Sequence, residues 1–224
     1  RMSYQIAIDG PAGAGKSTIA RSLARSLGFI YVDTGAKYRA MAYYFLKNRI
    51  DPENKSGIED ACADVDITIT YENGEQQVLL NGENITSQLR KESVGNMASV
   101  TSALPAVRIK LTQLQKKLAA STDVVMDGRD IGTAVLPDAQ MKIYLTAGTA
   151  VRAKRRYEEL KAQGIDKSLE SIEKDIRNRD YRDMHRDISP LCQAEDAVLV
   201  DTSDMDIETV LNTIRRIYEE KKRS

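Results

Sequence analysis

Residues 4–18 place a glycine-rich turn between a short apolar run and an amphipathic repeat. The run YQIAID ends at Asp9 and is typical of a buried strand, whereas Ile19, Leu23 and Leu27 recur after the turn at helical spacing. The turn fits the pattern G-x-x-x-x-G-K-[ST], which binds phosphate when it joins a strand to a helix. A strand followed by a crossover helix returns to the sheet in the same direction, so this unit predicts a parallel sheet.

The glycine-rich turn has the residues needed to hold a nucleoside triphosphate. Glycines let the backbone wrap around phosphate oxygens with its N–H groups toward the anion, and the helix that follows adds its positive N-terminal end. Lys16 supplies a point charge for the β- and γ-phosphates, and the Ser17 hydroxyl is expected to bind Mg²⁺. We predict ATP as the donor, held by Gly10, Pro11, Ala12, Gly13, Ala14, Gly15, Lys16, Ser17 and Thr18.

The rest of the chain repeats the alternation of strands and helices. Short apolar runs predict five core strands, at residues 4–9, 29–33, 123–127, 142–146 and 197–201. Helical periodicity lies between them, at residues 36–49, 92–119, 150–163, 169–185 and 207–222. We expect one α/β unit over residues 1–224, with a doubly wound, five-stranded parallel sheet.

One stretch, residues 67–86, departs from this alternation. Its short β-rich segments flank the dipeptides Asn73-Gly74 and Asn81-Gly82, which are the strongest short signals for a tight hairpin turn. We therefore predict an antiparallel insertion at about residues 60–95.

Composition excludes several classes of protein. Lysine and arginine number 33 and so do aspartate and glutamate, so no net charge draws the chain to nucleic acid or to anionic lipid. The single histidine argues against multi-histidine metal sites, and Cys62 and Cys192 lie too far apart for a zinc ribbon. No apolar run has the length of a membrane span, and the N-terminus does not resemble a secretory signal. These features predict a monomer in the cytoplasm.

The predicted strand that ends at Asp127 indicates what happens to the γ-phosphate. ATPases usually place a glutamate after this aspartate to activate water, but Gly128 follows here, and the N-K-x-D guanine motif of GTPases is absent. These absences favour transfer to a second substrate. We expect Asp127 to contact the water ligands of Mg²⁺.

Three further segments are candidates for the acceptor side. The sequences DTGAKYR (residues 33–39) and DGRDIGT (residues 127–133) follow core strands, and ligands of open α/β sheets bind beyond the carboxyl ends of strands. Arg179, Asp183 and Arg186 have the spacing of one helical face, if the helix extends that far. Arginine forks match phosphate oxygens, although a solvated salt-bridge face is the alternative for this group. Arg155, with Lys154 and Lys161, is assigned to such a solvated face.

Taken together, these motifs resemble the bacterial cytidylate kinase family. IDGPAGAGKST, DTGAKYRA, ALPAVR, MDGRDIGT, the helix that contains RRY, and RDYRDMHRDISPL occur in the family's order and cover essentially the whole chain. The resemblance implies a P-loop kinase fold with a nucleoside monophosphate-binding insertion and a short helical lid at about residues 150–190. It also implies Mg²⁺-dependent phosphorylation of CMP and dCMP by ATP.

The resemblance also implies roles for individual residues. The acceptor phosphate is assigned to Thr34, Arg39, Arg129 and Arg186, the sugar to Arg179 and Asp183, the cytosine to Ser99, Arg108 and Asp130, a lining role to Tyr38, and the donor phosphates to Arg152 and Arg156. Two positions depart from the family pattern: Lys37 stands where an apolar residue is expected, and His185 where asparagine is usual. The alternatives are a kinase for another small acceptor, such as UMP or AMP, and a P-loop protein that binds nucleotide without turnover.

Overall fold

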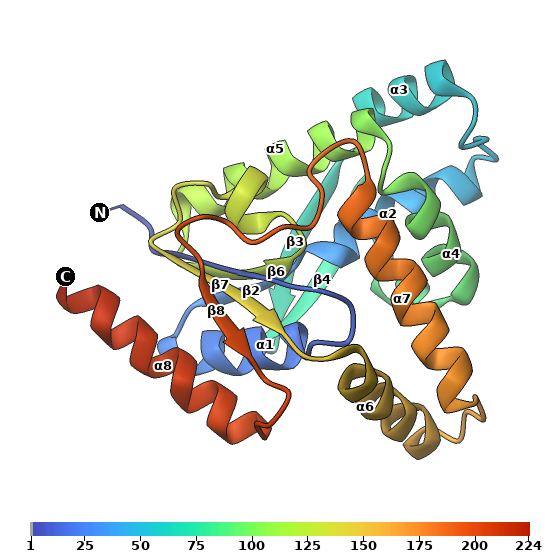
Figure 1. The fold of residues 1–224 in the computed structure, drawn as a ribbon. Helices are drawn as coiled ribbons and strands as arrows, with labels where there is room; N and C mark the ends of the chain where they lie inside the picture. Colours follow the sequence, from blue (N-terminus) through green and yellow to red (C-terminus); the bar gives the residue numbers. More distant parts are fainter. Residues whose placement is uncertain (1) are drawn as a thin grey trace. The chain divides into compact units, whose positions relative to one another are not determined.

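The computed structural model describes residues 2–224, which form two compact units (Figure 1). Unit 1 contains the chain up to Tyr31 and again from Thr122 to Ser224, and unit 2 contains the intervening residues, Val32–Ser121. The chain therefore leaves the first unit after its second strand begins and returns before the third core strand. Each unit has its own hydrophobic core.

Unit 1 is built on a parallel sheet of five strands. These are β1 (Gln5–Asp9), β2 (Ile30–Asp33), β6 (Val124–Gly128), β7 (Met141–Thr146) and β8 (Val198–Asp201), in the order β2-β6-β1-β7-β8. The last two residues of β2, Val32 and Asp33, are counted with unit 2. Strand β1 pairs in parallel with β6 and β7, and β7 pairs in parallel with β8. The five predicted strands and their parallel arrangement are confirmed.

Four long helices accompany this sheet: α1 (Lys16–Leu27), α6 (Thr149–Ala162), α7 (Leu169–His185) and α8 (Ile207–Arg223). Ile19 and Leu23 of α1 and Ile214 of α8 share one buried cluster with Ile6 and Ile143 of the sheet. Helices α6 and α7 pack through a separate small cluster, which consists of Ala153, Leu160, Ile172 and Ile176. No helix within residues 2–224 is both long enough and apolar enough to cross a membrane.

Unit 2 combines helices with a small antiparallel sheet. Its elements are α2 (Thr34–Lys47), α3 (Lys55–Asp64), β3 (Ile67–Glu72), β4 (Glu75–Leu80), β5 (Glu83–Asn84), the 3₁₀ turn η1 (Thr86–Arg90), α4 (Glu92–Thr101) and α5 (Pro105–Ser121). Both predicted Asn-Gly turns are present, and Asn73 and Asn81 adopt positive φ angles of 51° and 49°. Positive φ at both central residues gives the turn a twist that matches the strands, so these dipeptides located the insertion correctly.

Two sequence expectations about helices were wrong in unit 2. The periodic segment 92–119 is not one helix, because the chain breaks between Thr101 and Pro105 into α4 and α5. A proline disfavours helical geometry in the residue before it, and it is tolerated at the first position of a new helix. The sequence reading also missed α3, where only Ile58, Ala61 and Cys62 are buried.

Candidate active site

The glycine-rich turn runs from the end of β1 to the start of α1. A side chain on Gly10 would place its Cβ 1.9 Å from the carbonyl oxygen of Leu145 in β7, so only glycine allows this close approach. Gly15 precedes α1 with a φ of 83°, and no side chain caps this helix N-terminus within the described part of the chain. The turn therefore offers uncapped backbone N–H groups at the positive end of a helix, which is the arrangement that binds phosphate.

Lys16 is held inside the turn and is only 6% exposed. Its ammonium donates a hydrogen bond to the carbonyl oxygen of Pro11 at 2.8 Å. Burial lowers the pKa of Lys16 well below its usual value, the positive charges of Arg129 and Arg179 act in the same direction, and Asp127 and Asp9 oppose them. The two arginines and two aspartates balance in charge, so burial is the main reason that the charged amine is disfavoured, and a bound polyanion would favour the charged form.

Three oxygen-bearing side chains meet beside the start of α1. The Ser17 hydroxyl donates to one carboxylate oxygen of Asp127 at 3.3 Å, and the Tyr31 hydroxyl donates to the other at 2.8 Å. No group of three or more histidine, cysteine or acidic residues that could hold a metal occurs among residues 2–224. The Ser17 and Asp127 oxygens suit Mg²⁺, which keeps most of its water and takes few protein ligands beside substrate phosphates.

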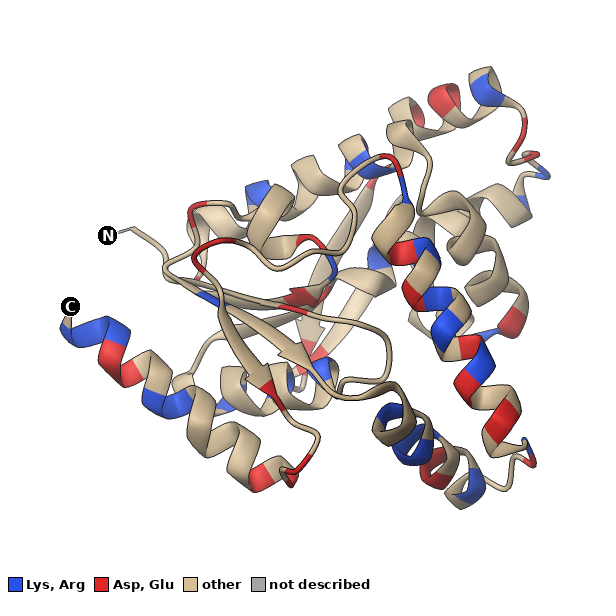
Figure 2. Ribbon diagram, in the orientation of Figure 1, with Lys and Arg blue, Asp and Glu red and all other residues tan. Residues whose placement is uncertain are grey.

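The two arginines of helix α6 that are predicted to reach the donor phosphates, Arg152 and Arg156, have different surroundings. Lysine and arginine recur along this helix (Figure 2). Arg152 is buried and bonds to the carbonyl oxygens of Ala147 and Ala12, at 2.8 Å and 2.9 Å, and to both carboxylate oxygens of Asp180. It therefore connects α6 and α7 to the phosphate-binding turn itself. Arg156 is exposed and pairs with Glu159 at 3.0 Å.

Arg155 does not belong to a solvated face, which corrects the sequence interpretation. Its guanidinium donates to the hydroxyl and carbonyl oxygens of Thr202, at 3.0 Å and 2.6 Å, and to the carbonyl oxygen of Met205. These acceptors follow β8, so the contact depends on a segment 47 to 50 residues away that no local pattern reveals. Arg155 anchors α6 to the loop after β8.

Asp9 is a site residue that the sequence analysis missed. It ends β1, is 5% exposed, and its two carboxylate oxygens accept the backbone N–H groups of Ile131 and Gly132, at 2.8 Å and 2.7 Å. These groups begin a short π-helical turn, η2 (Ile131–Val135), directly after the segment that contains Arg129 and Asp130. Burial raises the pKa of Asp9 to about 6, although the two N–H groups act in the opposite direction. In the sequence, the only sign of this role for Asp9 was that an acidic residue precedes the glycine-rich turn.

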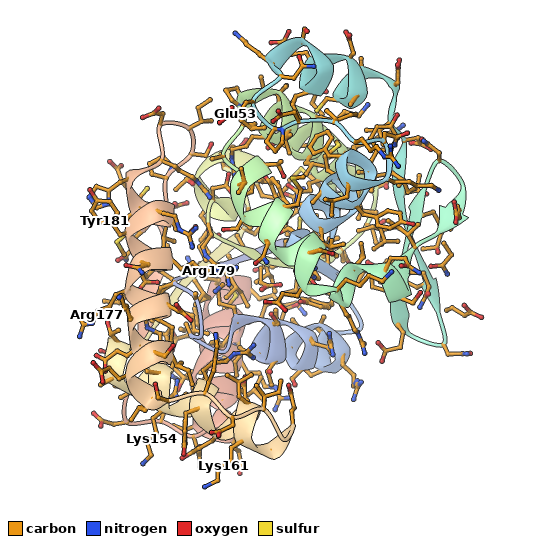
Figure 3. All side chains as sticks on the ribbon, turned by 90° about the vertical axis from the view of Figure 1, so that its right-hand side faces the viewer. Glu53, Lys154, Lys161, Arg177, Arg179 and Tyr181 are labelled. Carbon is orange, nitrogen blue, oxygen red and sulfur yellow. The ribbon has the colours of Figure 1, made fainter. Side chains whose placement is uncertain are left out.

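Within unit 1, the structure brings several predicted acceptor residues together. Arg129 pairs with Asp183 of α7 at 2.8 Å, and Arg186 lies 4.0 Å from Asp130 and donates to the carbonyl oxygen of Ser189. Arg179 lies on the opposite side of α7 from Arg177 and Tyr181 (Figure 3).

The expected single helical face is correct only for Arg179 and Asp183. Helix α7 ends at His185, and Arg186 has extended backbone angles, φ −68° and ψ 147°. The Nδ1 of His185 donates a hydrogen bond to the carbonyl oxygen of Tyr181 at 2.8 Å, and the His185 ring stacks on the Tyr181 ring. Its ring is therefore engaged with its own helix.

Unit 2 contains the remaining acceptor candidates. Arg39 of α2 pairs with Asp33 at 3.0 Å, and Thr34 is buried at the first position of this helix. The Arg108 guanidinium lies 5.1 Å from the centre of the Tyr38 ring and donates to the carbonyl oxygen of Ser102 at 2.9 Å. Ser99 is exposed on α4. The structure thus places Tyr38 beside Arg108. Arg39 directly follows Tyr38 in α2.

Lys37, which departs from the family pattern, lies at a buried position where a charged side chain is energetically unfavourable. Its side chain is 2% exposed, and its ammonium makes no hydrogen bond or ion pair with any residue in the range 2–224. Burial lowers the pKa of Lys37 to about 8. The fold therefore disfavours the charged form of this lysine, as expected for an amine that loses water without gaining a partner.

Comparisons with known proteins agree with this geometry. The family model for cytidylate kinase matches residues 6–220. The cytidylate kinase of Ligilactobacillus salivarius is 49% identical over 97% of both chains, and that of Carboxydothermus hydrogenoformans is 48% identical over 97% of this chain and 98% of its own. In fold alone, the chain resembles a shikimate kinase from Acinetobacter baumannii, with a TM-score of 0.50 and 16% identity over 99% of this chain and 96% of that one. The chain therefore belongs to the cytidylate kinase family.

Proposed function

We propose that this chain transfers the γ-phosphate of ATP to CMP and dCMP, which gives ADP and the corresponding diphosphate. The observation that carries this proposal is membership of the cytidylate kinase family over residues 6–220, with the same activity named for relatives across their full length. The free thiols of Cys62 and Cys192 support a reducing compartment such as the cytoplasm. We expect the protein to act as a monomer.

The donor phosphates occupy the turn between β1 and α1 in this proposal. Backbone N–H groups at the start of α1 and the buried Lys16 ammonium bind the anion. Ser17 holds Mg²⁺, with Asp127 facing its water ligands, and the ion neutralises charge on the phosphate oxygens when bound. Arg152 holds α6 against the turn through Ala12, and Arg156 of the same helix reaches the donor phosphates when the lid closes.

The acceptor phosphate is assigned to Thr34, Arg39, Arg129 and Arg186. Arginine supplies several N–H donors in a fixed plane and binds phosphate oxygens in pairs. Asp183 and Arg179 bind the sugar hydroxyls, with the Arg129–Asp183 ion pair holding a phosphate residue and a sugar residue in one fixed arrangement. This pair is mostly buried, so its geometry is maintained without competition from bulk water.

Base recognition is assigned to Asp130, Arg108 and Ser99, with Tyr38 lining the site. Cytosine presents an amino group at its N4 position, whereas uracil presents a carbonyl oxygen there. An ionised carboxylate can only accept hydrogen bonds, so Asp130 favours cytosine. Asp130 is buried, which makes an unpaired carboxylate costly with the wrong base.

The reaction needs no general base from the protein. The attacking oxygen belongs to a phosphate that is already ionised at neutral pH, so the protein's tasks are in-line positioning, charge stabilisation and exclusion of water. The chain supplies these through Lys16, the α6 arginines and closure of the helical lid. Exclusion of water matters because water competes with CMP as an acceptor.

The test is the release of ADP from ATP and Mg²⁺ with CMP, dCMP, UMP and AMP offered separately. The proposal predicts fast release with CMP and dCMP, and slow release with UMP and AMP. Preference for UMP or AMP would assign the chain to another monophosphate. ATP binding without release of ADP for any acceptor would indicate a nucleotide-binding regulator instead.

A further inference from the structure

The side chain of Gln76 pairs with the main chain of Asp33 within unit 2. Its carbonyl oxygen accepts the backbone N–H of Asp33 at 3.0 Å, and its amide nitrogen donates to the carbonyl oxygen of Asp33 at 3.5 Å. Asp33 is the last residue of β2 and Gln76 belongs to β4 in the hairpin, 43 positions later. One side-chain amide therefore satisfies both backbone groups of one residue, as a neighbouring strand would.

Asp33 in turn organises the start of α2. One of its carboxylate oxygens accepts the backbone N–H of Ala36 at 3.2 Å and so caps the helix, while the other pairs with the Arg39 guanidinium at 3.0 Å. The orientation of this carboxylate depends on the Asp33 backbone, because the side chain is short. Gln76 fixes that backbone on both sides of the Cα atom.

We propose that Gln76 is a positioning residue for the acceptor phosphate, and that it acts through Asp33 on Arg39. This inference rests on the proposed function, since it takes Arg39 as a phosphate-binding residue. It gives the β-rich insertion a specific role: the hairpin holds the start of α2 in the conformation that presents Arg39. Without the Gln76 contact, Arg39 is less well ordered and binds the phosphate more weakly.

The hairpin is well suited to serve as an anchor. Strands β3 and β4 pair over six residues on each side, from Ile67 with Leu80 to Glu72 with Glu75. Val78 and Leu80 are buried in the same hydrophobic cluster as Ala36 and Ala40 of α2. The strand that carries Gln76 is therefore fixed to the helix by packing, and the Gln76 amide adds a directional contact at the end of that helix.

The chemistry at this position requires an amide. Glutamine has one acceptor and two donors, which match the N–H and carbonyl groups of Asp33. Glutamate has no donor when ionised and adds a negative charge beside the Asp33 carboxylate. Methionine has nearly the same length and volume as glutamine but no strong hydrogen-bonding group, so it removes the contact without leaving a cavity.

Gln77 provides a matched control. Successive residues of a strand point to opposite faces, and the Gln77 carbonyl oxygen accepts a hydrogen bond from the Asn84 amide at 3.1 Å, away from Asp33. Gln77→Met thus removes a glutamine and one hydrogen bond from the same strand without touching α2. Any general weakening of the hairpin affects both variants.

The experiment compares Gln76→Met, Gln76→Glu and Gln77→Met with the unaltered chain in steady-state phosphorylation of CMP. Loss of two neutral hydrogen bonds predicts a rise of about tenfold in the KM for CMP for Gln76→Met, and a larger rise for Gln76→Glu. The KM for ATP and kcat are expected to change less than about twofold, since a positioning residue for the acceptor leaves the donor site intact. Gln77→Met should behave like the unaltered chain.

Two further measurements separate positioning from simple structural support. In an Arg39→Ala background, Gln76→Met should have almost no additional effect on the KM for CMP, because its effect passes through Arg39. Amide hydrogen exchange at Asp33 should be faster in Gln76→Met than in Gln77→Met, and this readout needs no activity.

The outcomes are distinct. Equal KM values for CMP in Gln76→Met and Gln77→Met, or a full Gln76→Met effect in the Arg39→Ala background, would overturn the role of Gln76. An unaltered chain that phosphorylates no CMP would instead refute the proposed function.

Discussion

Asp9 accepts a hydrogen bond from the backbone nitrogen of Gly132 at 2.7 Å, across 123 positions of the sequence. The strand that leads into the phosphate-binding turn therefore also holds the segment that contains Arg129 and Asp130. A side chain on Gly132 would place its Cβ 3.4 Å from the same Asp9 oxygen and 3.1 Å from Lys142, so the contact is tight on both sides. One carboxylate therefore connects the end of β1, which leads into the glycine-rich turn, to the segment after Arg129 and Asp130.

Asp9→Asn should impair the use of CMP more than the use of ATP. The asparagine amide has one acceptor oxygen, and its NH₂ group would face a backbone donor, so one of the two hydrogen bonds to η2 is lost. We expect kcat/KM for CMP to fall about tenfold or more, as for loss of a hydrogen bond to a charged group. Asp123→Asn is the control, because Asp123 accepts the backbone N–H of Tyr4 at 2.7 Å, at the opposite end of β1. Equal losses in both variants would contradict a specific role for Asp9.

Lys16→Met should abolish most turnover without loss of stability. The variant keeps the length of the buried side chain and removes the charge that faces the donor phosphates, which predicts a fall in kcat of about 100-fold or more. Because burial lowers the pKa of Lys16, the charged amine is a cost to the folded state, and its removal should leave the melting temperature equal or higher. The measurements are ADP release and thermal unfolding. A folded Lys16→Met protein with near-normal turnover would refute the assigned donor site.

Asp130→Asn should narrow the preference for CMP over UMP. The amide can both donate and accept, so it no longer repels the uracil carbonyl, and it pairs less well with the cytosine amine. Polar readout of this kind can discriminate by roughly 10⁴–10⁵, so even partial loss is measurable. The quantity to compare is the ratio of kcat/KM for CMP to that for UMP. If both values fall equally, Asp130 serves only to hold Arg186, which lies 4.0 Å away.

Lys37→Met should stabilise the protein at neutral pH. The pKa of Lys37 in the folded state is about 8 against 10.5 for an ordinary lysine, so the cost of holding the charged form is fully present below pH 8. This shift corresponds to about 3 kcal/mol in the free energy of unfolding. The unfolded chain binds this proton more tightly than the folded chain does. The free energy of unfolding of the unaltered chain therefore rises as the pH goes from 8 to 10.5.

Urea unfolding at pH 7 and pH 10 provides the check. The advantage of Lys37→Met should be largest at pH 7 and should shrink at pH 10. Lys55→Met is the control, since the Lys55 side chain is 89% exposed and its removal should have little effect at either pH. An advantage that does not change with pH would mean that packing of the methionine, and not the buried charge, is responsible.

Local chemistry explains which parts of the fold could be predicted. The turn at residues 10–17 and the two Asn-Gly hairpins depend on backbone angles that a few neighbouring residues impose. The five core strands could be predicted because each is a short, largely apolar run. The break between α4 and α5 was missed because helical periodicity continues across it, although Pro105 marks the start of the second helix.

The candidate site also has one part that could be predicted from the sequence and another that only the tertiary structure reveals. The sequence by itself predicted the glycine-rich donor turn, because its residue types and spacing match phosphate binding. The roles of the individual acceptor residues came from the resemblance to the cytidylate kinase family, and they stay predictions. Only the tertiary structure decided that Asp9 holds η2, that Gln76 holds Asp33 and that Arg155 reaches Thr202. It also decided that Lys37 is buried without a hydrogen bond or ion pair to any of residues 2–224. Each of these depends on which distant backbone groups and side chains the fold brings into contact, and hydrogen bonds between segments 40 to 120 positions apart leave no periodic signal in the residues between them.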